Sequence, residues 1–244
     1  MPAEVFQPGS PTHLVTATVC VFAMVAALVM GKRLLPTPAR ERRFRDAWAW
    51  GTLAFQLAAV GWWLSPDRRD WSVSLPLQLC DLAGFVAPVA LLTGRRWARI
   101  LLYFWGLGLS TQAFITPTLA VGPSHTHFWV FWMAHIAIVG SALYEVVVLG
   151  FRPSAKDLGK ALAMTWSYII LIAVFDWITG FNYAFVGPGE APAGTLVAAL
   201  GPWPWRVLVM MLMGSCVFAV LWGVWPLARA VGQAAGRASG RRGT

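Results

Sequence analysis

A thiol and an imidazole, two groups that can act together in nucleophilic chemistry, occur within apolar segments of this chain. Cys80 and Asp81 stand side by side in LPLQLCDLAGFVAPVALL, and His135 follows 55 residues after the cysteine in HFWVFWMAHIAIVG. A Cys thiolate is a strong nucleophile, and an imidazole can take the thiol proton. A carboxylate, Asp81 or Asp176, can hold the imidazole in one tautomer as the third member of a triad. We take these four as candidate catalytic residues.

The segments around these residues have the composition of membrane helices. The chain has 244 residues, of which 58% are hydrophobic and only 12% charged, whereas soluble domains carry about a quarter charged residues. Several apolar runs approach the ~20 residues that cross a bilayer, where a backbone must be helical. The sequence thus predicts an all-α polytopic bundle, with residues 1–230 as one domain of seven transmembrane helices and 231–244 as a flexible basic cytoplasmic tail. The spans are expected at about 12–31, 47–64, 74–94, 97–116, 127–149, 161–180 and 205–228.

The basic residues predict the orientation. With the N-terminus outside and the C-terminus cytoplasmic, all but three of the 19 Lys and Arg residues fall on the inner side; the exceptions are Arg68, Arg69 and Arg206. This distribution follows the positive-inside rule, and it predicts a multi-pass protein of the cell inner membrane.

The net charge of +9 therefore reflects topology. A nucleic-acid partner is not expected, because the charge is spread over several inner segments instead of one folded face. The three cysteines are widely spaced, so neither a disulfide framework nor a CxxC metal site is available. We expect no metal and no cofactor.

This topology places the candidate residues in one layer of the outer leaflet. At 1.5 Å per helical residue, Cys80 and Asp81 lie about 9–10 Å below the outer edge, His135 about 12 Å and Asp176 about 6 Å. Other side chains near this layer are expected to bind substrate or to stabilise an oxyanion. They are Gln78, Gln112, Asn182, Tyr183 and, in the aromatic stripe next to the histidine, Trp132.

Each candidate residue also has a plainer interpretation. A Cys in a membrane helix is usually a small apolar filler, which is how we interpret Cys20 and Cys216. A membrane His often only bonds a neighbouring helix. The two aspartates could bond Gln112, Tyr103 or Tyr168.

Two further ionisable groups fall outside the chemical hypothesis. Glu145 is expected at the inner edge, where it would reach the surface or pair with Arg152. The H-T-H sequence of His125 and His127 could suggest zinc, but two histidines without further ligands are a weak metal signal.

Several segments, in order, resemble the bacterial YwaF-type integral membrane family over about residues 44–225. They are LPLQLCDLAGFVAPVALLT, YFWGLGLSTQAFITP, HFWVFWMAHIAIVGSALY, GFNYAFV and LGPWPWRVL. That family is similar, more distantly, to eukaryotic multi-span lipid acyltransferases that make polyunsaturated ether phospholipids. In those enzymes a Cys in one span and a His in a later span are implicated as the catalytic pair.

The resemblance implies that Cys80 and His135 are the corresponding pair here. One departure stands beside the cysteine: family members often have His where this chain has Gln78, so a second imidazole is absent or replaced. The FNYAFV segment also departs from the commoner small-residue pattern, but it keeps Asn182 and Tyr183.

Three functional hypotheses follow. The first is a membrane enzyme that transfers or hydrolyses an acyl group, with membrane phospholipids or another acyl-lipid as its substrate. The second is a proton-coupled transporter or a lipid-binding protein that uses Asp81, His135 and Asp176; it ranks second because no internal repeat is visible. The third is a seven-helix receptor or retinal protein, and a purely structural or assembly role also stays open. A retinal protein is set aside, because no lysine follows Lys160 to form a Schiff base in the last span.

Overall fold

The computed structural model of the chain describes residues 6–35, 37–191 and 195–240, and in these residues it contains helices and no strand. The α-helices are α1 (Pro11–Val29), α2 (Pro38–Trp63), α3 (Leu79–Thr93), α4 (Arg96–Leu101), α5 (Thr126–Val147), α6 (Ala155–Thr179) and α7 (Trp205–Gly240). Two π-helical segments (Met30–Leu34 and Leu102–Leu109) continue α1 and α4. Short 3₁₀ segments lie at Ser110–Phe114, Tyr183–Phe185 and Val197–Leu200.

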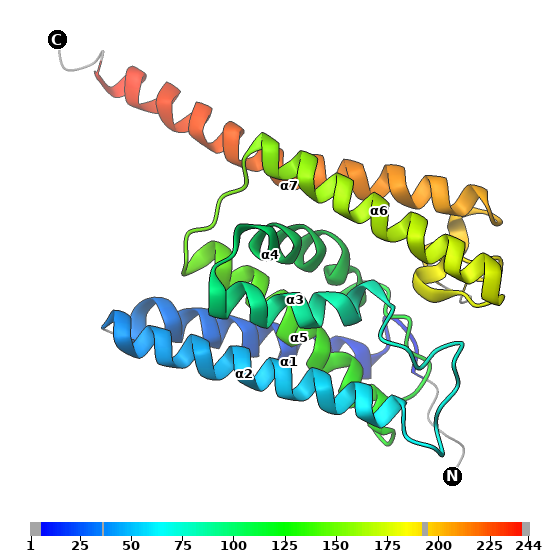
Figure 1. The fold of residues 1–244 in the computed structure, drawn as a ribbon. Helices are drawn as coiled ribbons and strands as arrows, with labels where there is room; N and C mark the ends of the chain where they lie inside the picture. The colour runs from blue at the N-terminus through cyan, green and yellow to red at the C-terminus, as the bar shows by residue number, and fades with distance from the viewer. Residues whose placement is uncertain (1–5, 36, 192–194, 241–244) are drawn as a thin grey trace.

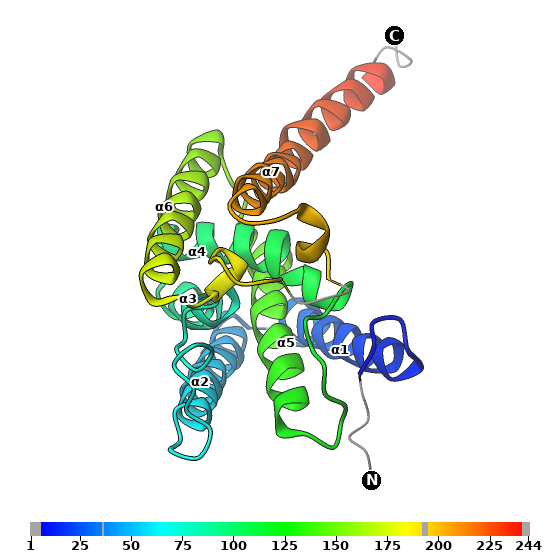
Figure 2. The ribbon, with the colours of Figure 1, turned by 90° about the vertical axis from the view of Figure 1, so that its right-hand side faces the viewer.

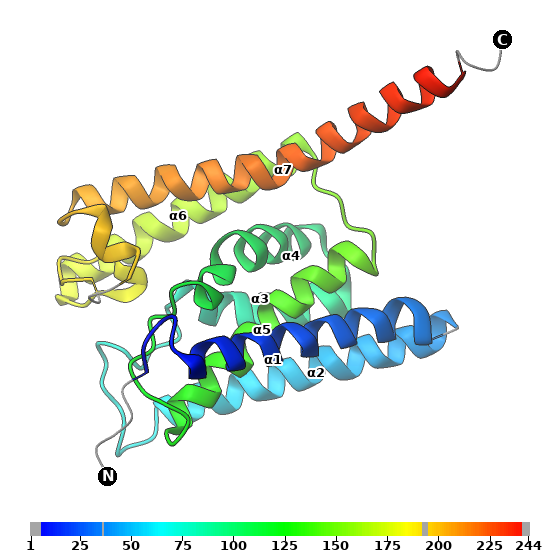
Figure 3. The same cartoon turned by 180° about the vertical axis from the view of Figure 1, so that it is seen from behind.

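The helices form layers in which α6 and α7 run side by side on one face and α1 and α2 run along the opposite face (Figure 1). Helices α3 and α4 lie between them (Figure 3), and α5 crosses from this middle layer to lie beside α1 (Figure 2). Seen from one end, α6 and α7 stand apart from α1, α2 and α5 (Figure 2). Successive helices run in opposite directions, as short connections require. The last turns of α7 project beyond the bundle.

Four helical segments are long and apolar enough to cross a membrane: Pro11–Leu34, Thr126–Val147, Ala155–Thr179 and Trp205–Gln233. Helix α3 is apolar but has only 15 residues. The prediction of an all-α membrane bundle is thus confirmed. The count of seven spans and the orientation of the termini stay predictions.

Several helices extend past the apolar runs from which they were predicted, because polar residues cap them further out. Helix α2 begins at Pro38, where the Thr37 hydroxyl accepts the N–H of Arg40. Helix α7 continues to Gly240, into the segment expected as a tail; residues 241–244 of that tail lie outside the described residues.

Helix α3 instead begins later than predicted, and this moves the cysteine. Pro76 precedes the helix, and Gln78, in an extended conformation, is its N-cap residue. The Asp81 carboxylate accepts the backbone N–H of Gln78 at 3.2 Å, the contact that an acidic N3 residue makes in a capping box. Cys80 is therefore in the first turn of α3 and not a turn and a half inside a longer helix.

The fourth predicted span has an irregular backbone. Helix α4 passes into the π-helical segment Leu102–Leu109 and then into the 3₁₀ segment Ser110–Phe114. The π segment packs tightly on α5, since a Cβ on Gly106 would lie 2.7 Å from that of Ala142. The transition between the two helix types, a feature often found at functional sites, occurs at the fully buried Ser110.

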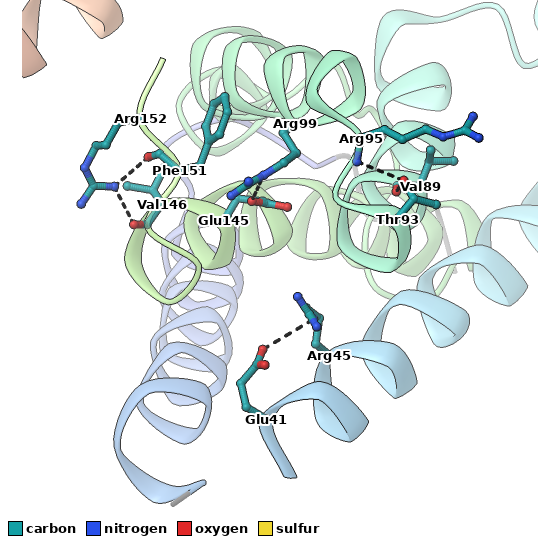
Figure 4. Close-up of polar contacts among 10 residues, drawn as sticks. All are labelled: Glu41, Arg45, Val89, Thr93, Arg95, Arg99, Glu145, Val146, Phe151 and Arg152. Carbon is teal, nitrogen blue, oxygen red and sulfur yellow. Dashed lines mark hydrogen bonds and ion pairs between the residues drawn. The ribbon is translucent and has the colours of Figure 1, made fainter. Parts of the chain in front are cut away.

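The end of the bundle that carries the 94–96 and 148–154 connections, here called the arginine end, is held by ion pairs (Figure 4). Arg99 Nε donates to the fully buried Glu145 at 2.7 Å. Arg152 donates instead to backbone carbonyls and lies 4.0 Å from the ring centroid of Trp225. The expected pairing of Glu145 with Arg152 is therefore wrong, because Glu145 faces α4 and not the following loop.

Candidate functional site

A cavity of about 650 Å³ occupies the opposite end of the bundle, here called the cavity end. Its walls come from α2, α3, α5, α6, α7 and the 3₁₀ segment Ser110–Phe114, so it passes through all the layers of the fold. The volume is within the range of small-molecule sites, and most of the lining is apolar. Among the residues singled out from the sequence, the cavity brings together Cys80, His135, Asp81, Gln112 and Gln78.

Cys80 lies at the start of α3, where its thiol meets the cavity. The Sγ atom is 3.7 Å from the hydroxyl oxygen of Ser110. The first N–H groups of a helix have no acceptor within it, and they carry the positive end of the helix dipole. The helix start therefore offsets only part of the cost of ionising a thiol in apolar surroundings, and a base is needed to take its proton.

His135 is a buried side chain of α5 whose tautomer is set by the backbone. Its Nδ1 atom lies 2.7 Å from the carbonyl oxygen of Phe131. Because a carbonyl only accepts, Nδ1 carries the hydrogen and Nε2 keeps its lone pair. Nε2 has no hydrogen-bond partner among the described residues. The Phe131 ring, with its centroid 4.3 Å from that of the imidazole, covers one side.

The two candidate catalytic groups share one cavity but are not hydrogen-bonded to each other. The thiol of Cys80 contacts Ser110, and the imidazole of His135 contacts Phe131. In proteins without bound substrate, catalytic hydrogen bonds are often long and shorten only in the substrate complex. The arrangement supplies a thiol, a base with a free lone pair and a shielded volume.

Two amide side chains add polar groups to the cavity wall. The Gln78 carbonyl accepts the backbone N–H of Ala184 at 2.8 Å, which fixes the amide and leaves its N–H₂ group without a partner among the described residues. Gln112 donates one N–H to Thr116. Both amides can therefore donate a hydrogen bond to a molecule in the cavity.

The two aspartates have different surroundings. Asp81 lines the cavity, but one of its oxygens accepts the Gln78 N–H that caps α3. Asp176 is fully buried near Gly187 and does not line the cavity, and neither carboxylate oxygen has a hydrogen-bond partner among the described residues. The nitrogen of His135 that a triad carboxylate would bond is occupied by the Phe131 carbonyl.

Asn182 and Tyr183 lie outside the cavity lining and connect loops. The Asn182 amide donates to the carbonyl of Glu190 at 2.9 Å. The Tyr183 hydroxyl donates to the carbonyl of Trp71 at 2.6 Å and accepts the N–H of Leu75 at 3.0 Å. The Asn182 bond closes the loop after α6 on itself, whereas the Tyr183 bonds tie that loop to the segment that leads into α3, so Tyr183 supports the position of Cys80 indirectly.

Trp132 also lies outside the cavity lining, in a separate aromatic cluster. It is almost fully buried, with rings of Phe6, His13, Phe114 and Phe128 around it. Its position two residues before Ala134 on α5 turns it toward α1, whereas Phe131 and His135 face the cavity.

Sequence reasoning missed several polar residues of the cavity, among them Ser110 and Thr165, and it considered Tyr168 only as a partner of the aspartates. Ser110 contacts the thiol, and Tyr168 donates its hydroxyl hydrogen to the Leu77 carbonyl at 2.7 Å. Ser110 could have been found from the polar run Ser110–Gln112, which ends an apolar segment. Of this run, only Gln112 was considered.

Metal-binding side chains do not gather in the described part of the chain, where no group of three or more His, Cys, Asp and Glu residues is found. His127 packs on the edge of Trp63 at the cavity wall, with ring centroids 5.0 Å apart.

An all-helical bundle with membrane-length apolar helices and an internal cavity defines a polytopic membrane protein. The TMEM164 family profile matches residues 9–222, and the chain belongs to this family. No curated protein and no solved structure matches the chain significantly. Family membership agrees with the expected multi-span membrane protein, while the YwaF-type resemblance and the acyl-transfer activity stay predictions.

Proposed function

We propose that the protein is a thiol-dependent acyltransferase that moves an acyl group of a membrane phospholipid through a thioester on Cys80. One observation carries the proposal: the Cys80 thiol and the His135 imidazole, with its free Nε2, line one largely apolar cavity. The pair is also the one that the family resemblance implies. Water as the final acceptor would make the same site an acyl hydrolase.

In the first half-reaction, Nε2 of His135 takes the thiol proton and the sulfur attacks the ester carbonyl carbon. A C–S bond forms, the C–O bond breaks, and the imidazolium returns its proton to the leaving alkoxide. The products are an acyl-Cys80 thioester and a lysophospholipid. Since the two groups are not hydrogen-bonded in this structure, the step requires the S–H bond to turn toward the imidazole, while the Ser110 hydroxyl donates to the developing thiolate.

In the second half-reaction, the hydroxyl of an acceptor lipid gives its proton to His135 and attacks the thioester carbonyl carbon. The C–S bond breaks, and the cysteine leaves as a thiolate that takes the proton back. Each tetrahedral intermediate carries an oxyanion, and donors aimed at it lower the barrier. The Ser110 hydroxyl, the first N–H groups of α3 and the amides of Gln78 and Gln112 are donors at the cavity wall.

Within the same proposal, the chain crosses the cell inner membrane seven times with the N-terminus outside. The arginine end then faces the cytoplasm, as the positive-inside rule requires. Cys80, the second residue of α3, would then lie in the outer leaflet near the start of that helix, close to the outer edge of the hydrocarbon. This is close to the depth of glycerol-ester carbonyls, so a phospholipid could present its ester without leaving the bilayer.

The test uses purified protein in liposomes that contain a phospholipid with an alkyne-tagged acyl chain. We expect wild type to acquire the tag in a bond that neutral hydroxylamine cleaves, as it does a thioester, and to pass the tag to an added lysophospholipid. Cys80→Ala should acquire no tag. His135→Ala should acquire it at least about a hundredfold more slowly, the range for loss of a general base.

The matched controls are Cys20→Ala and Cys216→Ala, which remove the other two thiols and should leave labelling unchanged. Transfer by Cys80→Ala at the wild-type rate would overturn the proposal. Labelling of Cys80 without transfer to any lysophospholipid, but with release of free fatty acid, would assign the hydrolase.

Proton-coupled transport has less support. A proton path along α5 would have to join His135 to Glu145, about 15 Å further along the helix. Ile138 and Ala142 lie between them, and both are fully buried in the apolar core. The cavity is thus separated from the charged arginine end by packed hydrocarbon.

A further inference from the structure

The cavity does not end at the catalytic pair but continues between α6 and α7. Tyr168 marks the level of the α3 entry, because its hydroxyl bonds the Leu77 carbonyl. Leu162, which also lines the cavity, is six residues away, or about 9 Å along α6. On α7 the lining runs from Met210 to Phe218, about 12 Å. We call this extension the α6–α7 arm.

The α6–α7 arm is almost wholly apolar. Besides the residues just named, its wall consists of Gly108, Leu109, Met211, Met213, Gly214 and Val217, with Trp166 and two hydroxyl side chains, Thr165 and Ser215. None of these side chains carries a charge. Methionine side chains are flexible and fill irregular shapes, so this wall suits a long, bendable hydrocarbon chain.

A second hollow lies on the outside of the same helix pair. This groove of about 260 Å³ is lined only by apolar and Trp side chains of α6, α7 and the preceding loop: Ile169, Ile170, Ala173, Val174, Trp177, Trp203, Val207 and Met211. Two of them, Ile169 and Met211, also line the main cavity. Because these two side chains contact both hollows and no other described residue lines both, they form the partition between the groove and the cavity.

The seam between α6 and α7 is weakly joined beside this partition. Among the described residues, one side-chain hydrogen bond links the two helices, from Trp166 Nε1 to Ser215 Oγ at 3.2 Å. Trp166 is 42% exposed and yet lines the cavity, as does the exposed Met213. Both helices are candidate membrane spans, so this exposed surface is the one that lipid would cover.

Resting on the proposed function, we propose that the α6–α7 seam is a lateral portal for an acyl chain of a membrane phospholipid. The chain enters from the bilayer past Ile169 and Met211. It then lies in the α6–α7 arm with its ester at Cys80. Gly214, in the arm wall, sets the length of chain that fits.

Gly214 is a suitable position for a test. A Cβ there would meet only Leu109 Cδ2, at 3.8 Å, which is an ordinary contact. A leucine therefore fits the backbone and projects into the arm, and it is a better helix former than glycine. The matched control is Gly223→Leu on the same helix, where a Cβ meets nothing within 4 Å and the residue does not line the cavity.

The experiment is photolabelling in liposomes with a phosphatidylcholine that carries a diazirine near the end of one acyl chain. Cys80→Ala protein is used, so that no acyl transfer occurs. We expect label on peptides containing Leu162 and Met213–Phe218. Gly214→Leu should lower labelling there at least fivefold for an 18-carbon chain and much less for a 12-carbon chain, while Gly223→Leu should change neither.

The portal is tested separately in a background without Cys20, Cys80 and Cys216. Ile169→Cys with Met211→Cys, joined by a short bismaleimide, should lower the labelling rate at least fivefold relative to either single cysteine capped with a maleimide. Competition by unlabelled phosphatidylcholine and by free fatty acid then identifies which lipid class the arm prefers. Stronger competition by free fatty acid would contradict a phospholipid occupant.

Label confined to the α2–α5 side of the cavity, at Val60 and Val130, would overturn the inference even if wild type transfers acyl groups. Labelling of the α6–α7 arm in a protein without any acyl-transfer activity would instead leave the inference in place and remove the proposed function. The two failures are therefore distinguishable.

Discussion

The sulfur of Cys80 and the hydroxyl oxygen of Ser110 lie 3.7 Å apart, at the point where two helix ends meet. Cys80 is in the first turn of α3, and Ser110 is where a π-helical segment gives way to a 3₁₀ segment. The contact depends on two irregular features of the backbone. Helix α3 begins at Leu79 and not near residue 74, and the fourth predicted span changes helix type at Ser110. The irregular backbone is what joins the thiol to a polar partner.

The first prediction concerns this contact. Ser110→Ala removes the hydroxyl from a fully buried position, and a hydrogen bond of this kind contributes about 0.5–1.5 kcal/mol. We expect acylation of Cys80 to slow roughly two- to tenfold. The measurement is the rate of tag transfer to Cys80, together with its pH profile.

A purely structural role for Ser110 would leave that pH profile in place, whereas loss of a group that bonds the sulfur should shift it. Ser110→Thr, which keeps a hydroxyl, should recover part of the rate. The neighbouring Thr111→Val is the control, because Thr111 bonds only the Leu107 carbonyl. Wild-type acylation by Ser110→Ala would contradict the prediction.

The fold was largely predictable because apolar periodicity and length report directly on membrane helices. The residues at which the helices begin were less predictable. A membrane span is recognised by its hydropathy, whereas the start of a helix is recognised by its capping residues. Asp81 illustrates the difference: in the sequence it is an ionisable residue within an apolar run, and in the structure it caps the helix that begins at Leu79. The pattern Gln78-x-x-Asp81 after Pro76 contained this information.

The site was predictable in its residue types and not in its connections. Cys80, His135 and Gln112 share the cavity, since equal depth is visible in sequence. The direction in which a side chain points around its helix is not visible in the sequence. Trp132 and Asp176 were therefore included for their depth, although neither lines the cavity. The carbonyl of Phe131 could not be foreseen as the partner of His135, because every residue has a carbonyl and only geometry selects one.

The second prediction separates capping from chemistry at Asp81. Asp81→Asn keeps an oxygen that can accept the Gln78 N–H. Its melting temperature should therefore equal that of wild type, and its acylation rate should stay within about twofold of the wild-type rate. Asp81→Leu loses the cap, which stabilises a helix start by about 1 kcal/mol. We expect a lower melting temperature in detergent for Asp81→Leu alone. Loss of acylation by Asp81→Asn, without loss of stability, would assign the carboxylate a catalytic role.

The third prediction concerns the ion pair at the arginine end. Glu145→Ala leaves Arg99 without its buried partner, and breaking such a pair costs about 3–5 kcal/mol. The melting temperature should fall clearly. The double variant Arg99→Met with Glu145→Leu replaces both charges by apolar groups and should recover most of the loss. Thermal unfolding of Arg99→Met, Glu145→Leu and the double variant measures the coupling, and simple additivity of the two single losses would contradict it.

The fourth prediction addresses orientation. Asp67 and Lys156 are exposed residues at the cavity end and the arginine end, respectively. In a background without the three native cysteines, Asp67→Cys should react with a membrane-impermeant maleimide in intact cells. Lys156→Cys should react only after the cells are opened. The reverse pattern would place the arginine end outside, against the positive-inside rule.

The last prediction concerns Asp176, a fully buried carboxyl group whose oxygens have no hydrogen-bond partner in the part of the chain that the structure describes. An unpaired buried carboxylate is costly, so an uncharged side chain of the same shape should be tolerated. Asp176→Asn should therefore keep the melting temperature of wild type or raise it, and acylation should stay within about threefold. In a catalytic triad, the same Asp→Asn change lowers the rate by about 10⁴-fold, because the imidazole loses its correct tautomer. Here the Phe131 carbonyl fixes that tautomer from the backbone, which no substitution of Asp176 removes. Acylation kinetics of Asp176→Asn decide whether Asp176 or the Phe131 carbonyl orients the imidazole. A loss of several thousandfold in the acylation rate of a stably folded variant would make Asp176 the orienting group and the carbonyl contact incidental.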